Sequence, residues 1–207
     1  MKITPIFHIL SILIMPLSGF MMISGFVDFV YNDQNWINFF ISATITLFVG
    51  MSVFLATRGN NDQNIDLRQA FVLTTMSWIT IAFFGALPFY LSNINLNFTD
   101  SFFESMSGIT TTGSTILINI EASPPGILAW RSLLQWLGGI GVIVMAIAIF
   151  PMLSVGGMQL FKAENFENPE KVVPRATSLT RGIFIIYSVL TLIWASLLYF
   201  SGMSSFD

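Results

Sequence analysis

The chain has 207 residues; 54% are hydrophobic, only 9% are charged, and the net charge is −3. A soluble domain carries roughly 25% charged residues, so the composition indicates a membrane protein, and the small net charge gives no support for a nucleic-acid partner. With no cysteine and one histidine, disulfides, thiolate metal sites and cysteine nucleophiles are excluded. The sequence has no paired carboxylates and no nucleophile–base set, so we expect a protein that is not an enzyme and has no covalently bound cofactor.

Five apolar stretches are long enough to cross a bilayer, for which a helix needs roughly 20 apolar residues. The first, at about 25 residues, is too long for the apolar region of a cleavable signal peptide. The fourth opens on Ser123-Pro124-Pro125, a typical helix start. The expected spans are residues 3–27, 36–57, 70–91, 126–153 and 182–202. The predicted fold class is therefore all-α integral membrane, with lipid around it.

The Lys and Arg residues indicate the orientation of these spans, because basic residues are retained on the cytoplasmic side. With a cytoplasmic N-terminus and five crossings, only Arg131 lies toward the outside. The other seven basic residues fall inside, namely Lys2, Arg58, Arg68, Lys162, Lys171, Arg175 and Arg181. If residues 101–117 also crossed, every basic residue after them would change sides. The charges therefore predict that this segment returns to the face from which it entered.

Residues 101–117, SFFESMSGITTTGSTIL, predict a short helix with an extended return. Ser101 and Glu104 have the spacing of a capping box, which places the helix start at Ser101. Three β-branched threonines followed by glycine end the helix near Ile109. About nine helical residues rise roughly 13 Å, close to half of a ~30 Å hydrocarbon core. The expected structure is a re-entrant loop.

Irregular backbone at membrane depth is tolerated where protein surrounds it or where it lines a water-filled path. Successive carbonyls of an extended Thr-Thr-Thr-Gly run can replace the water shell of a dehydrated cation. The C-terminal end of the half-helix favours a cation, and Gly113 permits a positive φ that aims a carbonyl. From the residues alone two interpretations stay open. The segment is one quarter of a cation selectivity filter, or it is a structural hairpin whose Thr and Ser side chains pack helices.

Two blocks of sequence resemble a known family. FFESMSGITTTGSTIL and WRSLLQWLGGIGVIVMAIAIFPMLSVGGMQLFKAE, with a later Pro-Arg before a new span, are similar to the membrane subunit of the Trk/Ktr potassium uptake systems. The resemblance covers nearly the whole chain. It implies an extra helix pair followed by four helix–pore-loop–helix repeats around one pore, with a glycine-containing filter in each loop.

The resemblance also implies a domain plan. Residues 1–58 would be the extra helix pair, and residues 69–153 the first helix–pore-loop–helix repeat with its re-entrant loop at 101–117. Residues 154–181 would be a cytoplasmic connection, and residues 182–207 the first helix of an incomplete second repeat. Family members are considerably longer, so we expect a partial chain in which the later repeats and their gate are missing.

For function, the resemblance implies potassium uptake across the bacterial cytoplasmic (inner) membrane. The backbone carbonyls of Thr111 and Thr112 would bind the transported potassium ion, with Thr110, Gly113 and Ser114 as supporting filter residues. A cytosolic nucleotide-binding regulatory subunit and a homodimer of complete chains are the implied partners, and symport is the implied mode. The alternatives are a less selective or sodium-coupled cation conductor and a non-conducting membrane scaffold with a structural hairpin.

Four other positions carry more than one interpretation. We expect Glu104 to close the capping box rather than to attract cations, and Arg131 to pair with Glu104 or Glu121 rather than to snorkel to the interface. In the LGGIG run that begins at Leu137, we expect close helix packing rather than a hinge. We expect Asp28 to be a solvated loop acid of the outer face rather than a residue that enriches cations at the mouth of the path.

Overall fold

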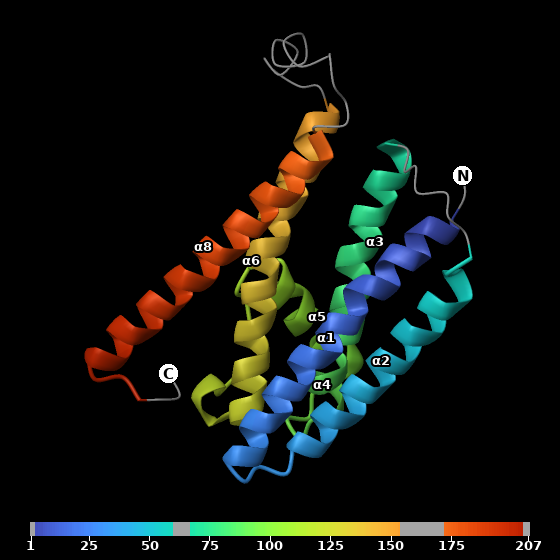
Figure 1. The fold of residues 1–207 in the computed structure, drawn as a ribbon. Coiled ribbons are helices and arrows are strands. Elements are labelled where there is room, and N and C mark those ends of the chain that lie inside the picture. Colours follow the sequence, from blue (N-terminus) through green and yellow to red (C-terminus); the bar gives the residue numbers. More distant parts are fainter. Residues whose placement is uncertain (1–2, 60–66, 154–171, 205–207) are drawn as a thin grey trace. The chain divides into compact units, whose positions relative to one another are not determined.

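The computed structural model describes residues 3–59, 67–153 and 172–204, and these residues form helices and turns with no β-strand among them (Figure 1). Five of the described helical segments are long and apolar enough to cross a membrane, which confirms the all-α membrane fold expected from the sequence. The elements are α1 (Thr4–Val30), α2 (Trp36–Thr57), α3 (Leu67–Gly85), α4 (Leu87–Leu91), α5 (Phe98–Ile109), the 3₁₀ turn η1 (Ile120–Ala122), α6 (Pro125–Leu153) and α8 (Val172–Phe200).

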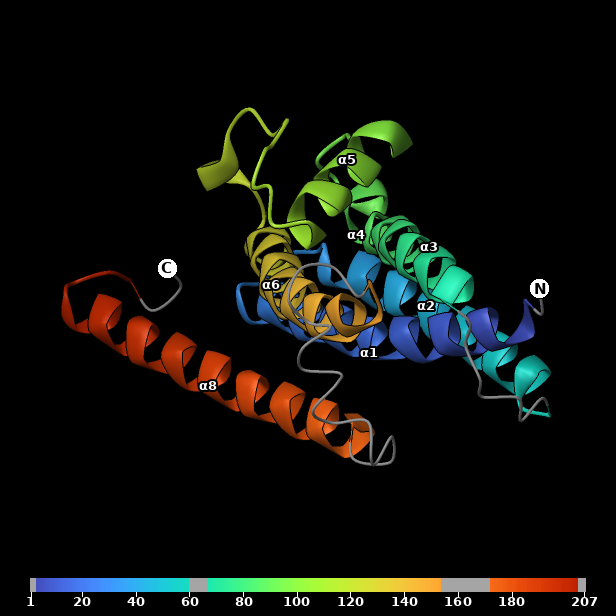
Figure 2. The ribbon, with the colours of Figure 1, turned by 90° about the horizontal axis from the view of Figure 1, so that it is seen from above.

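By their internal contacts the residues fall into two units, Met1–Gly139 and Ile140–Asp207. In the first unit, α1 and α2 run antiparallel and make the most extensive helix pair. Seen from above, α3 and α4 lie between this pair and α5 (Figure 2). The core is a cluster of buried side chains contributed by all of these helices and by the start of α6, namely Leu17, Met21, Phe39, Ala43, Ala82, Phe89, Ile109, Ile127, Trp130 and Leu134.

Small residues allow α1 and α2 to approach each other closely. A Cβ added to Gly25 would lie 2.8 Å from the Cβ of Phe39, and one added to Gly50 would lie 3.2 Å from the side chain of Ile14. In a bilayer no hydrophobic effect drives helices together, so they associate through close packing, which small residues at the interface permit. Gly25 and Gly50 therefore allow the close contacts between α1 and α2 at these two positions.

The expected third span is interrupted near its end, where α3 stops at Gly85 and α4 begins at Leu87. Pro88 accounts for the break, because proline has no N–H and its ring crowds the carbonyl four residues earlier. The carbonyl of Gly85 accepts a hydrogen bond of 2.9 Å from Nε1 of the buried Trp130 on α6. The break thus provides a backbone acceptor that fastens α6 to α3.

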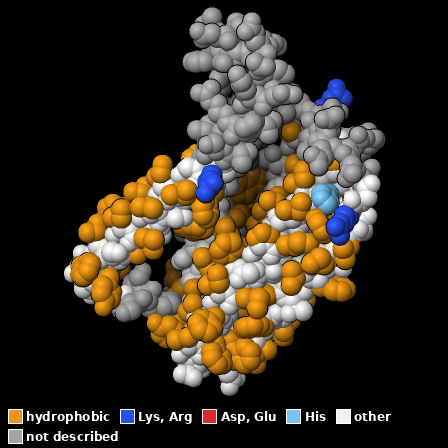
Figure 3. All heavy atoms as spheres, in the orientation of Figure 1, with side chains coloured by type: hydrophobic (Ala, Val, Ile, Leu, Met, Phe, Trp, Pro, Cys, Tyr) orange, Lys and Arg blue, Asp and Glu red, His pale blue; other side chains and the backbone are white. Residues whose placement is uncertain are grey.

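The outer surface of the first unit is apolar. Large hydrophobic side chains of α1 and α2 are exposed along their lengths, and Figure 3 shows them covering the face formed by these two helices. Exposed apolar area on this scale marks contact with lipid or with another protein. Together with the lengths of the helices, it identifies a multi-pass membrane protein.

In the second unit, α8 begins at Val172, ten residues before the expected span. The expected connection at residues 154–181 therefore lies outside the described residues over 154–171 and is helical over the rest. Pro174 lies in the first turn, where its missing N–H costs nothing. The polar residues of the TSLTR stretch were compatible with helix but indicated a loop by hydropathy alone. The membrane-length part of α8, Thr180–Phe200, buries none of its residues in the described structure.

Candidate functional site

The half-helix α5 starts three residues before the predicted position. Asn97 is its N-cap, and the Asn97 side chain accepts a hydrogen bond of 2.9 Å from the backbone N–H of Asp100. Ser101 lies inside the helix and its hydroxyl donates to the Asn97 carbonyl at 2.9 Å. The predicted capping box of Ser101 and Glu104 is wrong, because the helix starts about one turn earlier, with Asn97 as its N-cap.

Both ends of the segment between α4 and α6 are hydrogen-bonded to the same end of the α1–α2 pair. Before α5, the backbone N–H of Asn93 donates to Oδ1 of Asn35, the N-cap of α2, at 3.2 Å. After the loop, the N–H of Gly126 in the first turn of α6 donates to a carboxylate oxygen of Asp28 in the last turn of α1. Because residues 31–35 join α1 to α2 directly, the hairpin leaves and rejoins the helices at one end.

The C-terminus of α5 is closed by a pair of backbone hydrogen bonds. The N–H of Thr111 donates to the carbonyl of Gly108 at 2.9 Å, and the N–H of Thr112 donates to that of Ser107 at 3.0 Å. This is the Schellman arrangement, in which the residue after the C-cap adopts the left-handed conformation and is usually glycine. Here that residue is Thr111, with φ +58°. A β-branched residue with positive φ is strained, and such strain is concentrated at functional sites.

Beyond this turn the chain presents several carbonyls with no partner. In the part of the chain that the structure describes, no hydrogen bond reaches the carbonyls of residues 110–113. Gly113 has φ +76°, the positive value expected for it, and Thr111, Thr112 and Gly113 are exposed. The Thr110 hydroxyl donates to the Met106 carbonyl at 2.7 Å and lies 2.9 Å from that of Thr112. The carbonyls are therefore open while the Thr110 side chain is held in place.

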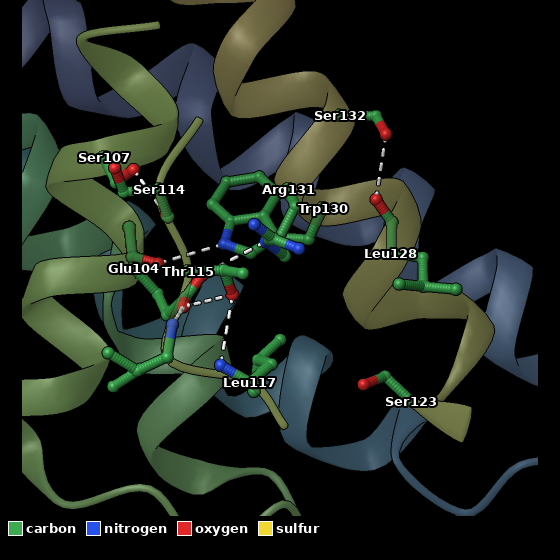
Figure 4. Close-up of polar contacts among 12 residues, drawn as sticks. Glu104, Ser107, Ser114, Thr115, Leu117, Ser123, Leu128, Trp130, Arg131 and Ser132 are labelled. Carbon is green, nitrogen blue, oxygen red and sulfur yellow. Dashed lines mark hydrogen bonds and ion pairs between the residues drawn. The ribbon is translucent and has the colours of Figure 1, made fainter. Parts of the chain in front are cut away.

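Ser114 differs from the four residues before it. Its carbonyl accepts a hydrogen bond of 2.6 Å from the hydroxyl of Ser107 on α5, so that oxygen is already engaged. Figure 4 shows this contact between the half-helix and the return. The unpaired run thus ends at Gly113, and Ser114 fastens the end of the run to α5.

Glu104 holds the return limb from inside α5. Its side chain is 1% exposed, and Oε1 accepts hydrogen bonds of 2.6 Å from both the Thr115 hydroxyl and the Ile116 N–H. Its Oε2 lies 3.1 Å from Nε of Arg131 on α6 (Figure 4). This ion pair is close but lacks good hydrogen-bond geometry, since Oε2 has no hydrogen-bond partner. The expected pairing of Arg131 with Glu104 is confirmed.

Helix α6 packs tightly against the end of α5. A Cβ on Gly138 would collide with the carbonyl oxygen of Ile109, and one on Gly108 would lie 3.0 Å from the Cβ of Leu134. At Gly138 the expected close packing is therefore confirmed. The last turn of α5 therefore packs directly against α6, immediately before the residues with open carbonyls.

The described side chains offer no alternative cation site, because no group of three His, Cys, Asp or Glu residues among them is placed to hold a metal ion. Hard cations prefer oxygen ligands, and the open backbone carbonyls of residues 110–113 are oxygen ligands of that kind. The sequence predicted the positive φ of Gly113 and the end of α5 near Ile109. It did not reveal the N-cap Asn97, the left-handed conformation of Thr111 or the contact between Asp28 and Gly126. The available signal for the N-cap was an asparagine followed three residues later by an acidic residue, Asp100, in the first turn.

Comparison with known proteins identifies the family. Residues 35–206 match the TrkH family, described as cation transport protein. The chain belongs to this family. The chain is 42% identical over 203 residues to the Trk system potassium uptake protein TrkI of Halomonas elongata, and 38% identical over 211 residues to the Trk system potassium uptake protein TrkH of Escherichia coli.

A solved structure also matches. The chain superimposes on the potassium transporter TrkH from Vibrio parahaemolyticus with a TM-score of 0.84 and 31% sequence identity, over 100% of this chain and 41% of that one. The two sequence relatives are likewise covered over 41% and 43% of their lengths, although 98% and 100% of this chain takes part. The chain thus spans less than half the length of the relatives it matches.

Proposed function

We propose that this chain forms part of a potassium uptake transporter in the bacterial cytoplasmic membrane, and that the backbone carbonyls of residues 110–113 line the ion path. Membership of a cation transport family and the potassium transporters among its relatives support the choice of ion. Residues 1–58 would be the extra helix pair, residues 69–153 the first pore-loop repeat, and residues 182–207 the beginning of the next.

The observation that carries this proposal is the run of open carbonyls at the end of α5. Irregular backbone whose carbonyls lack partners is costly in a membrane protein unless it lines a path that water or ions occupy. The Schellman turn uses the carbonyls of Ser107 and Gly108, and those that follow it are left open. A structural hairpin would be expected to satisfy these groups within the protein.

The geometry suggests how the loop would act on potassium. The backbone carbonyls of Thr111 and Thr112 are proposed to replace water around the ion, with Thr110, Gly113 and Ser114 holding the backbone. The C-terminus of α5 adds partial negative charge next to them. Carbonyls of one loop cannot surround an ion, so three further loops would complete the cage, as the resemblance to a four-repeat family implies.

The test of the filter is Gly113→Ser in a full-length transporter carrying residues 1–207. A residue other than glycine at φ +76° costs about 1–2 kcal/mol and turns the neighbouring carbonyls. We expect the preference for potassium over sodium to fall severalfold while the protein still reaches the membrane. Gly19→Ser on α1 is the matched control, because nothing lies within 4 Å of a Cβ there. Wild-type selectivity at normal protein level in Gly113→Ser would refute the filter assignment.

The two rival functions give different results in the same assay. A poorly selective conductor would take up rubidium with little discrimination against sodium before any substitution is made, and a sodium-coupled conductor would take up rubidium faster when sodium is present. A membrane scaffold would take up neither ion. Uptake of rubidium by the wild-type transporter, inhibited weakly by sodium, supports potassium uptake over both alternatives.

The partners are proposed from the resemblance. A cytosolic nucleotide-binding regulatory subunit would bind the cytoplasmic side of the transporter, and two complete chains would form a homodimer. Residues 154–171, which the resemblance assigns to the cytoplasmic connection, lie outside the described residues. Copurification of a soluble nucleotide-binding protein with the full-length transporter, and the mass of the purified complex in detergent, are the measurements that test these two proposals.

A further inference from the structure

Asp28 is a buried acid in an unexpected place. From the sequence Asp28 is expected among solvated residues, yet it is 0% exposed and lies in the last turn of α1. One carboxylate oxygen accepts from the N–H of Gly126, and the other has no hydrogen-bond partner among the described residues. Burying an ionisable group costs several kcal/mol unless it is paired. Because this burial lowers stability, the Asp28 carboxylate calls for a structural or functional explanation.

The start of α6 leaves one amide for this carboxylate. Pro125 has no N–H, and the N–H groups of Ile127 and Leu128 donate to the Pro124 carbonyl at 2.9 and 3.2 Å. Gly126 therefore supplies the free donor of the first turn, at the positive end of the helix dipole. A Cβ at Gly126 would collide with the Asp28 carboxylate, so the close approach requires glycine at that position.

The capped end of α6 leads directly to the contacts that hold the pore loop. Trp130, about one helical turn beyond Gly126, packs edge-on against Phe39 of α2 with ring centroids 6.5 Å apart and donates to the Gly85 carbonyl. Arg131 pairs with Glu104, which holds Thr115 and Ile116. A displacement of α6 at Gly126 would therefore be carried to both limbs of the loop.

We propose that Asp28 is a positioning residue for the ion path, through which the extra helix pair fixes α6 and thereby the carbonyls after α5. The inference rests on the function proposed above. It assigns to a helix pair that lies outside the pore-loop repeat an influence on selectivity that acts through α6. The chain of contacts runs from Asp28 to Gly126, then through Arg131 to Glu104.

The experiment measures rubidium uptake and its inhibition by sodium in a full-length transporter carrying residues 1–207. Asp28→Leu and Gly126→Ala each remove the contact, one by deleting the acceptor and one by filling its space. We expect each to raise the KM for rubidium roughly threefold to tenfold and to weaken discrimination against sodium. A change of about this size in a binding constant corresponds to the free energy lost when one partner of a buried charged hydrogen bond is removed. The double variant should be no worse than the poorer single variant, since both changes break the same contact.

Two further variants separate positioning from general stability. Asp28→Asn keeps an oxygen that can accept from Gly126, so it should retain a KM within about twofold of wild type. Ile14→Ala weakens α1–α2 packing at a buried site beside Gly50, and should lower the amount of protein and the maximal rate but leave KM unchanged.

The outcomes distinguish this inference from the function on which it rests. Absence of rubidium uptake by the wild-type transporter overturns the proposed function and this inference with it. Wild-type uptake with unchanged KM in both Asp28→Leu and Gly126→Ala overturns the inference alone, as does an Asp28→Asn variant as impaired as Asp28→Leu. Should Asp28→Leu fail to accumulate, Gly126→Ala, which keeps the carboxylate, and Asp28→Asn decide the matter in the same way.

Discussion

Thr111 combines a β-branched side chain with a left-handed backbone, and this conformation was not foreseeable from the sequence. The run of three threonines correctly predicted the end of α5 near Ile109, because β-branched residues disfavour continued helix. The same property argues against a positive φ at any one of them. Only the hydrogen bonds of Thr111 and Thr112 to the last turn of α5 select which threonine takes the strain.

Replacing Thr111 by glycine should relieve that strain. We expect Thr111→Gly to raise the unfolding midpoint of the purified full-length transporter, by an amount equivalent to about 1 kcal/mol, because glycine adopts positive φ without steric cost. Potassium selectivity should fall, since glycine fixes the adjoining carbonyls less firmly. Thr112→Gly is the control, because Thr112 has no positive φ and should gain no stability. A lower midpoint for Thr111→Gly than for Thr112→Gly would contradict the strain argument.

Glu104 illustrates how local spacing misleads. Ser101 and Glu104 stand at the spacing of a capping box, yet the carboxylate instead contacts Thr115, Ile116 and Arg131. These partners lie 11 to 27 positions further along the chain, so no pattern within one helix turn could reveal them. The expected pairing with Arg131 was accessible from charge alone, because few opposite charges are available nearby in so apolar a sequence.

Breaking this pair from one side should be worse than removing both charges. Glu104→Gln and Arg131→Gln each leave a charge unpaired, with Glu104 fully buried and Arg131 14% exposed, and breaking a buried pair costs about 3–5 kcal/mol. We expect the double variant to accumulate better and to unfold at a higher temperature than either single variant. Unfolding midpoints of the four proteins form the cycle, and simple additivity of the two losses would show that the ion pair is not energetically coupled.

At the scale of elements, helix existence followed from hydropathy, while breaks and some ends did not. The second span was predicted at its observed bounds, since Asp and Asn before Trp36 and Arg58 after Thr57 mark abrupt changes of polarity. Polar residues within the first ten positions of α8 hid that part of the helix. The interruption of the third span at Gly85 follows from Pro88, and the Gly85 carbonyl at the break accepts a tertiary hydrogen bond from Trp130. Hydropathy indicates whether a segment lies in lipid or in water, but it does not show where a helix breaks or ends.

The close approach of α6 to α5 makes Gly138 a sensitive position. A methyl group there would run into the Ile109 carbonyl oxygen, and overpacking of this kind costs about 1–3 kcal/mol. We expect Gly138→Ala to reduce both the amount of folded transporter and its rubidium uptake. Gly182→Ala on α8, where nothing lies within 4 Å, should behave as wild type. Equal behaviour of the two variants would mean that α5 and α6 can separate without consequence.

For the whole molecule, the two hydrogen bonds at the ends of the hairpin and the distribution of basic residues lead to the same topology. Asn35 contacts the chain before α5 and Asp28 contacts it after the loop, so the segment leaves and rejoins the α1–α2 pair at one end. The basic residues independently predicted a segment that does not cross. The Lys and Arg residues of the sequence predict the side of the membrane on which each connection lies. The contacts that bring the two ends of the segment together are visible only in the folded structure.

Thiol labelling tests this topology directly, because the chain has no cysteine of its own. We propose that the turn after α1 lies outside and that residues 59 and 168 lie in the cytoplasm, as retention of Lys and Arg on that side favours. Gln34→Cys, in the exposed turn between α1 and α2, should react with an impermeant maleimide added to intact cells. Gly59→Cys and Asn168→Cys should react only after the membrane is permeabilised, which also serves as the control that each thiol is accessible. Labelling of residue 168 in intact cells, with residue 59 still protected, would mean that the segment containing α5 crosses the membrane, and the re-entrant arrangement would have to be abandoned.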